Sequence, residues 1–519
     1  MTITTAKMPL AGPTFRLLPL ALGALLLSAE CHAQWRVTPR IDLRETYSDN
    51  IGLRSDADAR GGFVSEASPT IAVSANGPRL TLNAEAGWRM FAYSNDDSND
   101  LRNSERHYNA TARAMLVDQL FFVDAAASGS RQAVSAFGPV SSNNYSSANN
   151  TDISTWRISP YLQHRFGSVA ELNMRYTRDS VSGGVGGFAN SLANTGSVDL
   201  SSGRAFTSVG GNLSYYHQDL KDGLAGVSSS ENLTAGLRWS VIRRLALTAN
   251  VGYDRYEYPV LNESTQGRSW STGFIWTPST RTRVQASFGR RYFGKTGALA
   301  SSYRTQRTVW SLDYNDAITT SRQQFLLPAA VDTAAMLDSL FAANFPDPAQ
   351  RQQAVQAYMA AAGLPPTLID SINYLSNRYI RIRRLQGTAL LRGARSNLTF
   401  TVFRDQRNAM STQQSDSALL LGQLSTLNDN TRQRGASANF DYRLSTRSNA
   451  YASLSASRIH SLDTQLTNNL SEMHFGATHR FDAKTQGNLE FRHNRGSAYQ
   501  YGNGSYHENA IAATFSVQY

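Results

Sequence analysis

Arginine is the side chain whose number and placement in this sequence could support chemistry. The 519 residues carry 50 lysines and arginines against 39 acidic residues, a formal charge of +11, and lysine occurs only as Lys7, Lys221, Lys295 and Lys484. A guanidinium group pairs bidentately with carboxylates and phosphates. For an exported protein, this balance favours lipopolysaccharide, anionic sugars or acidic solutes as partners, and makes nucleic acid an unsuitable one.

Eight arginines share the phase of the polar residues in alternating segments, so they would line the interior of a barrel. They are Arg89, Arg175, Arg281, Arg283, Arg291, Arg307, Arg381 and Arg383, with Glu85, Glu171, Asp254 and Asp313 on the same phase. Charged residues in a lumen set selectivity, which predicts a preference for anionic solutes. The alternative is that these arginines pair with the acidic residues across strands and stiffen the wall. Arg432 and Arg434 are predicted to contact lipopolysaccharide.

Catalytic motifs do not account for the remaining polar residues. No serine has the context of a nucleophile elbow, and the nine histidines lack metal-ligand spacing. Phosphate-loop and dinucleotide signatures are also missing. His474 is expected to face the interior and make a structural hydrogen bond. We therefore predict no catalytic residue, metal or cofactor, and a protein that is not an enzyme.

The first 33 residues have the pattern of a signal peptide. Lys7 and Arg16 form a basic segment, residues 17–27 form an apolar core, and cleavage is predicted after Ala33. A lipoprotein anchor at Cys31 is the alternative, although Glu30 occupies a position that favours a small residue. Because Cys31 is the only cysteine, the predicted mature chain cannot form disulfides.

Residues 34–519 repeat a run of about 10–14 alternating residues, a tight turn, a second run and a longer polar loop. Residues 166–168 and 278–280 are examples of predicted turns, and residues 132–150, 294–302 and 408–430 of predicted loops. Later segments lack the roughly 20 apolar residues of a membrane helix. The pattern predicts an all-β fold, a transmembrane antiparallel β-barrel of about 22 strands in the bacterial outer membrane, with its short turns facing the periplasm.

The last strand is expected to close this barrel. Ile511, Ala513, Phe515, Val517 and Tyr519 share one apolar face, and the residues between them are polar or small. A terminal aromatic of this kind resembles the signal that the outer-membrane insertion machinery recognises. The alternative is an edge strand of a soluble sandwich.

Residues 328–376 break the alternation and are predicted to form a small helical insert. Val331–Phe341 has helical spacing, and Asp347 followed by Pro348 would cap a second helix over 349–362. The insert is either a plug or lid of the barrel or a helix pair packed on itself. Its apolar residues are Met336, Leu340, Phe341, Val355 and Tyr358. It would lie on the extracellular side if the preceding segment, a predicted strand over 318–327, runs outward, and on the periplasmic side otherwise.

Three stretches resemble a known family: residues 44–51 (RETYSDNI), residues 157–167 (RISPYLQHRFG) and residues 324–328 (QFLLP). Together with the insert, they are similar to outer-membrane proteins associated with the PEP-CTERM/exosortase system, which are encoded with exopolysaccharide loci of Gram-negative bacteria. The resemblance implies a barrel that assists polysaccharide export or surface assembly, with periplasmic export components as possible partners. It supplies no catalytic residues.

Three functions follow from these features. The first is a conduit linked to exopolysaccharide export, with an arginine-lined lumen. The second is a general or anion-selective porin, and the third is a non-conducting structural or adhesive surface barrel. The sequence does not determine the sugar, the direction of transport or the oligomeric state.

Overall fold

The computed structural model describes residues 34–95, 101–140, 145–147, 149–183, 190–222, 226–258, 263–326, 331–332, 367–368, 379–410, 430–498 and 504–519. The predicted signal peptide lies outside these residues. Within them, no helix is both long and apolar enough to cross a membrane.

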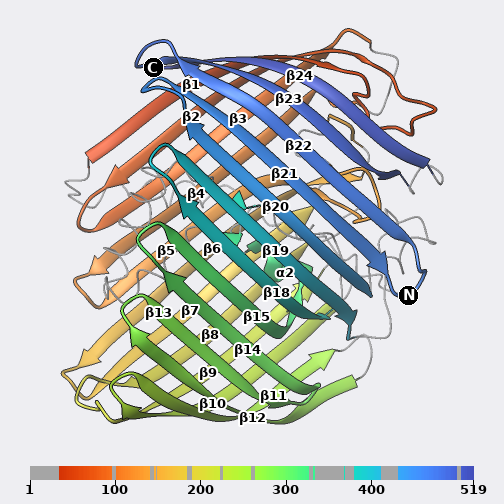
Figure 1. The fold of residues 1–519 in the computed structure, drawn as a ribbon. Helices are drawn as coiled ribbons and strands as arrows, with labels where there is room; N and C mark the ends of the chain where they lie inside the picture. The colour runs from red at the N-terminus through yellow and green to blue at the C-terminus, as the bar shows by residue number, and fades with distance from the viewer. Residues whose placement is uncertain are drawn as a thin grey trace, which may run out of the picture.

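The described chain forms one 22-stranded antiparallel sheet that closes on itself (Figure 1). Each strand pairs with the next along the chain, and the first pairs with the last. The strands are β1 (Gln34–Ser48), β2 (Gly62–Asn76), β3 (Leu80–Tyr93), β4 (Ser104–Val117), β5 (Phe121–Ala133), β6 (Asn150–Phe166), β7 (Ala170–Gly183), β8 (Ser191–Ser202), β9 (Val209–Asp222), β10 (Gly226–Ile242), β11 (Leu245–Tyr258), β12 (Glu263–Ser279), β13 (Thr282–Arg291), β14 (Gly294–Arg304), β15 (Thr308–Thr320), β18 (Tyr379–Arg392), β19 (Ser396–Ala409), β20 (Thr431–Arg443), β21 (Ser448–Ser461), β22 (Thr467–Arg480), β23 (Thr485–Ala498) and β24 (Gly504–Gln518). The predicted fold and strand number are confirmed.

Alternation along each strand separates an apolar outer face from a polar inner face. In β24, Ile511 and Phe515 are 54% and 45% exposed, whereas Ala512 and Ser516 are buried. Phe515 lies opposite Leu43 of β1, whose side chain is also exposed. Because successive side chains of a strand point to opposite faces, the exposed apolar residues lie outside the ring.

At one end of the barrel, strands are joined by turns of two to six residues, and we call this the short-turn end. Four of these turns repeat a Ser, Thr or Asp followed two residues later by Arg or Lys and then by Ser or Thr. The four begin at Ser279, Thr305, Ser445 and Asp482. In each, the first side chain accepts a hydrogen bond from the backbone N–H two residues later, at 3.2, 3.3, 3.1 and 2.7 Å. These are local Asx- and ST-type turns.

The opposite end, the loop end, carries the long connections together with several short ones, of which the shortest joins β13 and β14. Residues 294–302, predicted as a loop, lie in β14, and β13 and β14 are joined through Tyr292 and Phe293 alone. Gly294, with φ of +115°, follows this turn in a conformation that side chains disfavour. The prediction of a loop at 294–302 was therefore wrong, because a glycine-rich polar segment can also pair as a strand.

The strand predicted over residues 318–327 is also corrected. Residues up to Thr320 belong to β15, and Ser321–Leu326 form a short helix, α2. β15 runs toward the loop end and β18 returns from it, so the insert connects them at that end.

Most of the insert, including the predicted plug residues Met336, Leu340, Phe341, Val355 and Tyr358, lies outside the described residues. Its described part is a pair of two-residue strands, β16 (Val331–Asp332) and β17 (Thr367–Leu368). The helix predicted from Val331 therefore does not begin there. Pairing with a segment about 35 residues away supplies backbone hydrogen bonds that local helical spacing cannot anticipate.

Candidate functional site: a lumen crossed from two walls

The two faces of the sheet define the class of protein. A closed antiparallel barrel with an even number of strands, an apolar exterior and a polar interior is the architecture of outer-membrane β-barrels. Trp270, Phe274 and Trp276 of β12 lie on the exterior, between 38% and 46% exposed. The chain is therefore an outer-membrane-type β-barrel. Barrels of 22 strands enclose a wide lumen that is typically plugged, so the segments inside the ring form the candidate functional site.

The described residues between β5 and β6, which are 134–140, 145–147 and 149, lie inside the ring, and we call this connection the inner loop. Asn149 fastens the base of this loop. Its side-chain oxygen accepts a hydrogen bond from the Ser135 N–H at 2.8 Å, and its amide donates to the carbonyls of Ser135 at 2.9 Å and Pro139 at 3.2 Å. Asn149 has φ of +56°, a left-handed conformation that asparagine tolerates better than most residues. The loop therefore has a fixed shape at its origin.

The far part of the inner loop contacts strands near the barrel seam. The Tyr506 hydroxyl donates to the Val140 carbonyl at 3.0 Å and accepts from the Val140 N–H at 3.3 Å. The Asn468 amide donates to the Ala136 carbonyl at 3.0 Å. Phe137, 1% exposed, packs against Ile459. The inner loop thus reaches from β5 to β21, β22 and β24.

Tyr145 fixes the returning arm of the inner loop against β1 and β3. Its ring packs edge-on against Phe91 with centroids 5.5 Å apart. Its hydroxyl donates to Thr46 at 3.3 Å. Arg131 of β5 donates to the Ser146 carbonyl beside it. Apolar packing and hydrogen bonds therefore both hold this part of the inner loop against the wall. Such contacts are expected of a buried segment rather than of a surface loop.

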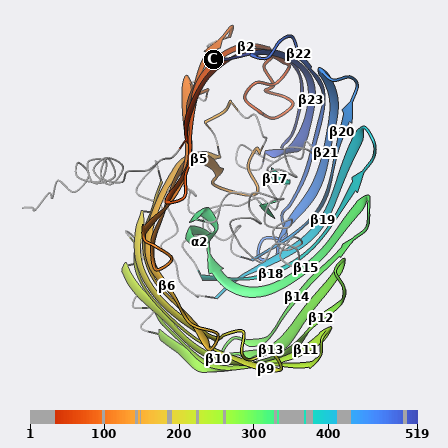
Figure 2. The same ribbon diagram turned by 90° about the vertical axis from the view of Figure 1, so that its left-hand side faces the viewer.

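Helix α2 enters the ring from β15 and contacts the opposing strands β6 and β7 (Figure 2). Arg322 is buried, donates to the Ser191 hydroxyl at 2.8 Å and forms an ion pair with Asp179. The Arg157 guanidinium donates to the Leu326 carbonyl at the end of the helix. Two segments from different parts of the sequence therefore cross the lumen at its loop end.

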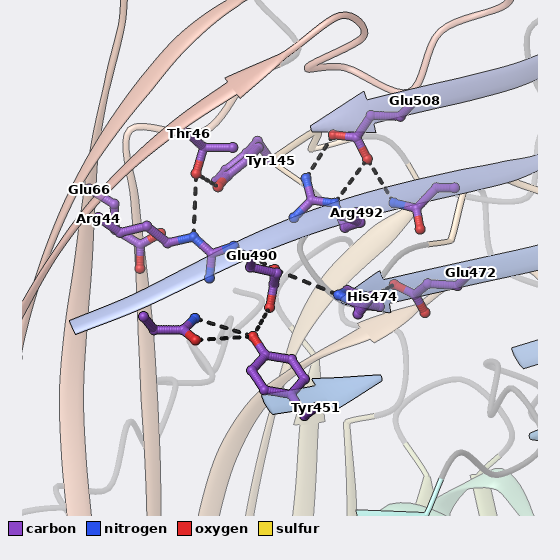
Figure 3. Close-up of polar contacts among 12 residues, drawn as sticks. Arg44, Thr46, Glu66, Tyr145, Tyr451, Glu472, His474, Glu490, Arg492 and Glu508 are labelled. Carbon is purple, nitrogen blue, oxygen red and sulfur yellow. Dashed lines mark hydrogen bonds and ion pairs between the residues drawn. The ribbon is translucent and has the colours of Figure 1, made fainter. Parts of the chain in front are cut away.

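The wall beside the inner loop carries a dense polar network (Figure 3). Arg492 and Glu508, both 1% exposed, form an ion pair at 2.7 Å, and Glu508 also accepts from Ser48 at 2.8 Å and Asn494 at 2.7 Å. Glu490 accepts from Arg44 at 2.9 Å. Because each charge has an opposite partner, the network joins β1, β23 and β24 at the seam without a large net field.

A second part of this network surrounds Glu490 and His474. The Tyr451 hydroxyl donates to Glu490 at 2.9 Å, and the His474 ring lies 3.0 Å from Glu472 and 3.6 Å from Glu490. The structure thus places His474 on the inner face with the polar partners expected for it. Among the described residues, no group of three histidine or acidic side chains is arranged to hold a metal ion.

Four of the eight predicted selectivity arginines lie on the inner face of their strands: Arg89, Arg175, Arg283 and Arg291. Three of them have carboxylate partners. Arg89 lies 2.8 Å from Glu66, Arg175 lies 3.1 Å from Asp124, and Arg291 lies 2.8 Å from Asp254. These pairs agree with the alternative that arginines stiffen the wall. A role in selectivity stays a prediction.

Arg281 and Arg307 lie in short turns, at the third position of the repeated motif. Arg281 and Arg283 nevertheless come together around a cavity of about 340 Å³ at the short-turn end, which we call the rim cavity. Arg244 and Arg304 complete its four arginines, and its lining residues include no carboxylate. The structure thus gathers two of the predicted arginines with two that the sequence analysis did not select.

Arg381 and Arg383 lie on the outer face, which corrects their predicted inward phase. They alternate with Leu385, whose exposed side chain lies outside the ring. Both contact Asp316 of β15, at 2.6 and 3.6 Å. The neighbouring Arg384 points inward instead, where it pairs with the buried Asp405 at 2.9 Å. Consecutive arginines occupy both phases here, so polarity alone did not reveal which one faces the lumen.

The inner loop itself was missed by sequence reasoning, which treated residues 132–150 as an ordinary polar loop. One signal was available. Phe137, Val140 and Tyr145 are large apolar or aromatic residues in a stretch otherwise rich in serine and asparagine. Such residues in a long loop need a surface to cover them.

Comparisons with known proteins find similarity to solved structures only. No family model and no curated protein sequence matches the chain. Similar solved structures include the FrpB iron transporter from Neisseria meningitidis (F5-1 variant), at 10% identity and a TM-score of 0.49 over 93% of this chain and 82% of that one. BauA, the ferric preacinetobactin receptor from Acinetobacter baumannii, is 11% identical, with a TM-score of 0.47 over 93% of this chain and 80% of that one. The siderophore receptor PirA from Pseudomonas aeruginosa is 10% identical, with a TM-score of 0.43 over 93% and 80%. At these values the likeness carries no inference about function.

Proposed function

We propose that this protein is a gated conduit of the bacterial outer membrane, and that the solute it serves is an exopolysaccharide. The observation that carries the proposal is the inner loop, which lies inside the ring and is fastened to the wall between β5 and β21 through contacts that are separate from the strand pairing. Hydrogen bonds of Tyr506 and Asn468 hold its far part, and the hydroxyl of Tyr145 holds its returning arm to Thr46. A net hydrogen bond contributes about 1 kcal/mol, so a small set of contacts separates a closed from an open lumen.

The polysaccharide is proposed from two lines of support. The resemblance to exopolysaccharide-associated barrels is the first. The second is the chemistry of the inner wall, where Arg89, Arg175 and Arg291 are each neutralised by a carboxylate. A wall of hydroxyls, amides and paired charges offers hydrogen bonds to a hydroxyl-rich polymer without holding one ion tightly. We propose no catalytic role for it.

The test is conductance and polymer entry in planar bilayers containing the refolded mature protein. Wild type is expected to open rarely, and a variant without residues 135–147 is expected to open often and to admit neutral dextrans from one side. A variant that inserts but stays silent after this deletion would favour a structural or adhesive barrel. Deleting the gene should also reduce surface polysaccharide, and an unchanged polysaccharide coat would reject the assigned solute while leaving the conduit intact.

An anion-selective pore is the second candidate, and the rim cavity favours it. Its four arginines have no carboxylate among the lining residues, and uncompensated charge along a pore favours ions of opposite sign. In the loop-deleted background, Arg281→Gln with Arg283→Gln is expected to shift the reversal potential in a salt gradient toward cations. Arg175→Gln, which also removes a partner of Asp124, is the matched control from the inner wall. An unchanged reversal potential in the double variant would reject this candidate.

A further inference from the structure

We propose that three arginines on the outer face form a binding site for the phosphate of an anionic lipid headgroup. They are Arg404 of β19, Arg434 of β20 and Arg458 of β21, and we call them the arginine row. The register places Arg404 directly opposite Arg434, and Arg434 directly opposite Arg458. All three side chains are exposed. The inference rests on the outer-membrane location proposed above and is independent of any transport.

The arginine row lies on the lipid side of the wall. Arg404 shares its phase with Phe400 and Val402, which are 44% and 42% exposed. Arg434 shares its phase with Phe440, 40% exposed. Arg434 is the fourth residue of β20 from the loop end, so the row lies near the loop end of the barrel with exposed apolar side chains toward the middle. This is the level at which a membrane barrel meets lipid headgroups.

The charge of the row is uncompensated within the described part of the chain. Like charges directly opposite each other destabilise a sheet, and adjacent strands lie only about 4.8 Å apart. None of the three arginines has a carboxylate partner among the described residues, whereas Arg384 on the inner face of the neighbouring β18 has Asp405 at 2.9 Å. The inner-face arginine is neutralised by the protein, so the outer row requires its counter-charge from outside.

A phosphate monoester fits this requirement. Its oxygens accept bidentate hydrogen bonds from guanidinium groups, and a row of three offers more donors than one phosphate needs. A lipid is favoured over free phosphate because Phe400, Val402 and Phe440 provide apolar surface for acyl chains next to the row. Arg432, two residues beyond Arg434 toward the loop end, extends the basic surface. The site therefore matches an acylated, phosphorylated disaccharide such as lipid A.

The experiment counts bound lipids by native mass spectrometry on the refolded mature barrel in zwitterionic detergent. Three probes are titrated: bis-phosphorylated lipid A, its dephosphorylated form and inorganic phosphate. The test variant is Arg404→Gln, Arg434→Gln and Arg458→Gln together. The matched control is Arg243→Gln, Arg395→Gln and Arg447→Gln, which removes the same charge from exposed turns at the short-turn end. A third variant carries lysine at all three row positions and keeps the charge without the bidentate geometry.

We expect the row variant to bind lipid A at least about tenfold more weakly, the control to stay within about twofold, and the lysine variant to fall between them. The dephosphorylated lipid should not distinguish the row variant from wild type. Without anionic lipid, the row variant should unfold at the same or a higher temperature than wild type, because like-charge repulsion is relieved. This second readout confirms that the variant is folded.

Three results would overturn the proposal. In the first, the row variant and the control lose equal affinity. In the second, the dephosphorylated lipid binds as tightly as lipid A. In the third, inorganic phosphate saturates the row at the concentrations that lipid A requires, which would make it a plain anion site. Since the arginine row lies outside the lumen, failure of the lipid site would leave the conductance test of the proposed function unaffected.

Discussion

The two ends of this barrel are held by opposite kinds of contact. At the short-turn end, side chains bond to backbone two or three residues away, as Ser445 and Asp482 do. At the loop end, the inner loop is held by Tyr506 and Asn468, which are separated from their partners by 366 and 332 residues. One end is therefore built from local chemistry, and the other exists only once the ring has closed.

This difference has a functional consequence. The hydrogen bonds of a local turn join residues that the paired strands already hold close together. The inner loop could leave its seat without disturbing a single strand pair, because all of its anchors beyond the base join the loop to the wall. Segments that move are drawn from the parts of a protein with few and separable contacts.

The largest effect is expected from releasing the far part of the inner loop. Tyr506→Phe with Asn468→Ala and Phe137→Ala removes its hydrogen bonds and its buried ring. At about 1 kcal/mol for each hydrogen bond and at least about 3 kcal/mol for the phenylalanine, the closed state should lose most of its population. Single-channel recording should show frequent openings where wild type is mostly closed.

The control for this release is Tyr176→Phe, which removes one exposed tyrosine hydroxyl that donates to Asn194 on the outer face. It should leave conductance unchanged. The release itself can be reversed chemically, because the predicted mature chain has no cysteine. Cysteines at Val140 and Tyr506, joined by a short bismaleimide, should hold the lumen closed. Openings that persist in the cross-linked protein would show that the inner loop does not gate.

The next largest effect is expected at the buried seam pair. Glu508→Gln leaves the Arg492 guanidinium buried without its carboxylate, which should destabilise the barrel by about 3–5 kcal/mol. Glu171→Gln removes the partner of Arg165 at the short-turn end, where the side chains are 62% and 38% exposed, and should change stability by less than about 1 kcal/mol. Urea unfolding in lipid vesicles, followed by tryptophan fluorescence, measures both.

Replacing both members of the seam pair checks the cause. Arg492→Met with Glu508→Leu should recover much of the stability lost in Glu508→Gln, because no charge is left unpaired. If the double variant is as unstable as the single one, packing rather than charge determines the loss.

An intermediate effect on stability is expected from one substitution at the base of the inner loop and one in a short turn. Asn149→Ala removes three hydrogen bonds at the base of the inner loop and places alanine in a left-handed conformation, so a loss of about 2–4 kcal/mol is expected. Ser445→Ala removes two hydrogen bonds of an exposed turn and should lose about 1 kcal/mol or less. Hydrogen exchange of the Ser135 and Ser448 amides compares the two positions. Equal protection losses would contradict the contrast between the ends.

The smallest effect is a pH dependence at the short-turn end. Hydrogen bonds from the Thr485 hydroxyl and from the backbone amides of Lys484 and Thr485 hold the pKa of the Asp482 carboxyl below its usual value of 3.8. A carboxyl whose pKa is lowered on folding stabilises the fold above the unfolded-state pKa and loses that contribution as pH falls through the folded-state pKa.

Asp482→Asn should therefore flatten the stability profile as pH is lowered from about 5 to about 2. Unfolding temperatures of wild type and variant should converge at the acidic end of this range and differ at the other. If the unfolding temperatures of the two proteins change with pH in parallel, the Asp482 carboxylate does not contribute to the pH dependence of stability.

The β-barrel could be predicted from local patterns in the sequence. Apolar and polar residues alternate with a period of two, as in Ile511 to Tyr519. This pattern is a property of one strand and does not depend on how that strand pairs, so the strand number and the apolar exterior could be predicted. Local turn chemistry beginning at Ser279 or Asp482 is equally readable, because donor and acceptor lie within one turn of the chain.

The segments that lie inside the ring could not be predicted from the sequence, because contacts between distant residues hold them there. Tyr145 bonds to Thr46, 99 residues away, and Arg322 bonds to Asp179, 143 residues away. No local sequence pattern encodes contacts over such separations. The sequence also did not determine which face of the sheet each arginine occupies. Arg383 and Arg384 are adjacent and equally polar, and their phases were decided by pairing with Asp316 and Asp405 on different strands. Closure of the ring sets these partners, since it brings distant segments within hydrogen-bond reach.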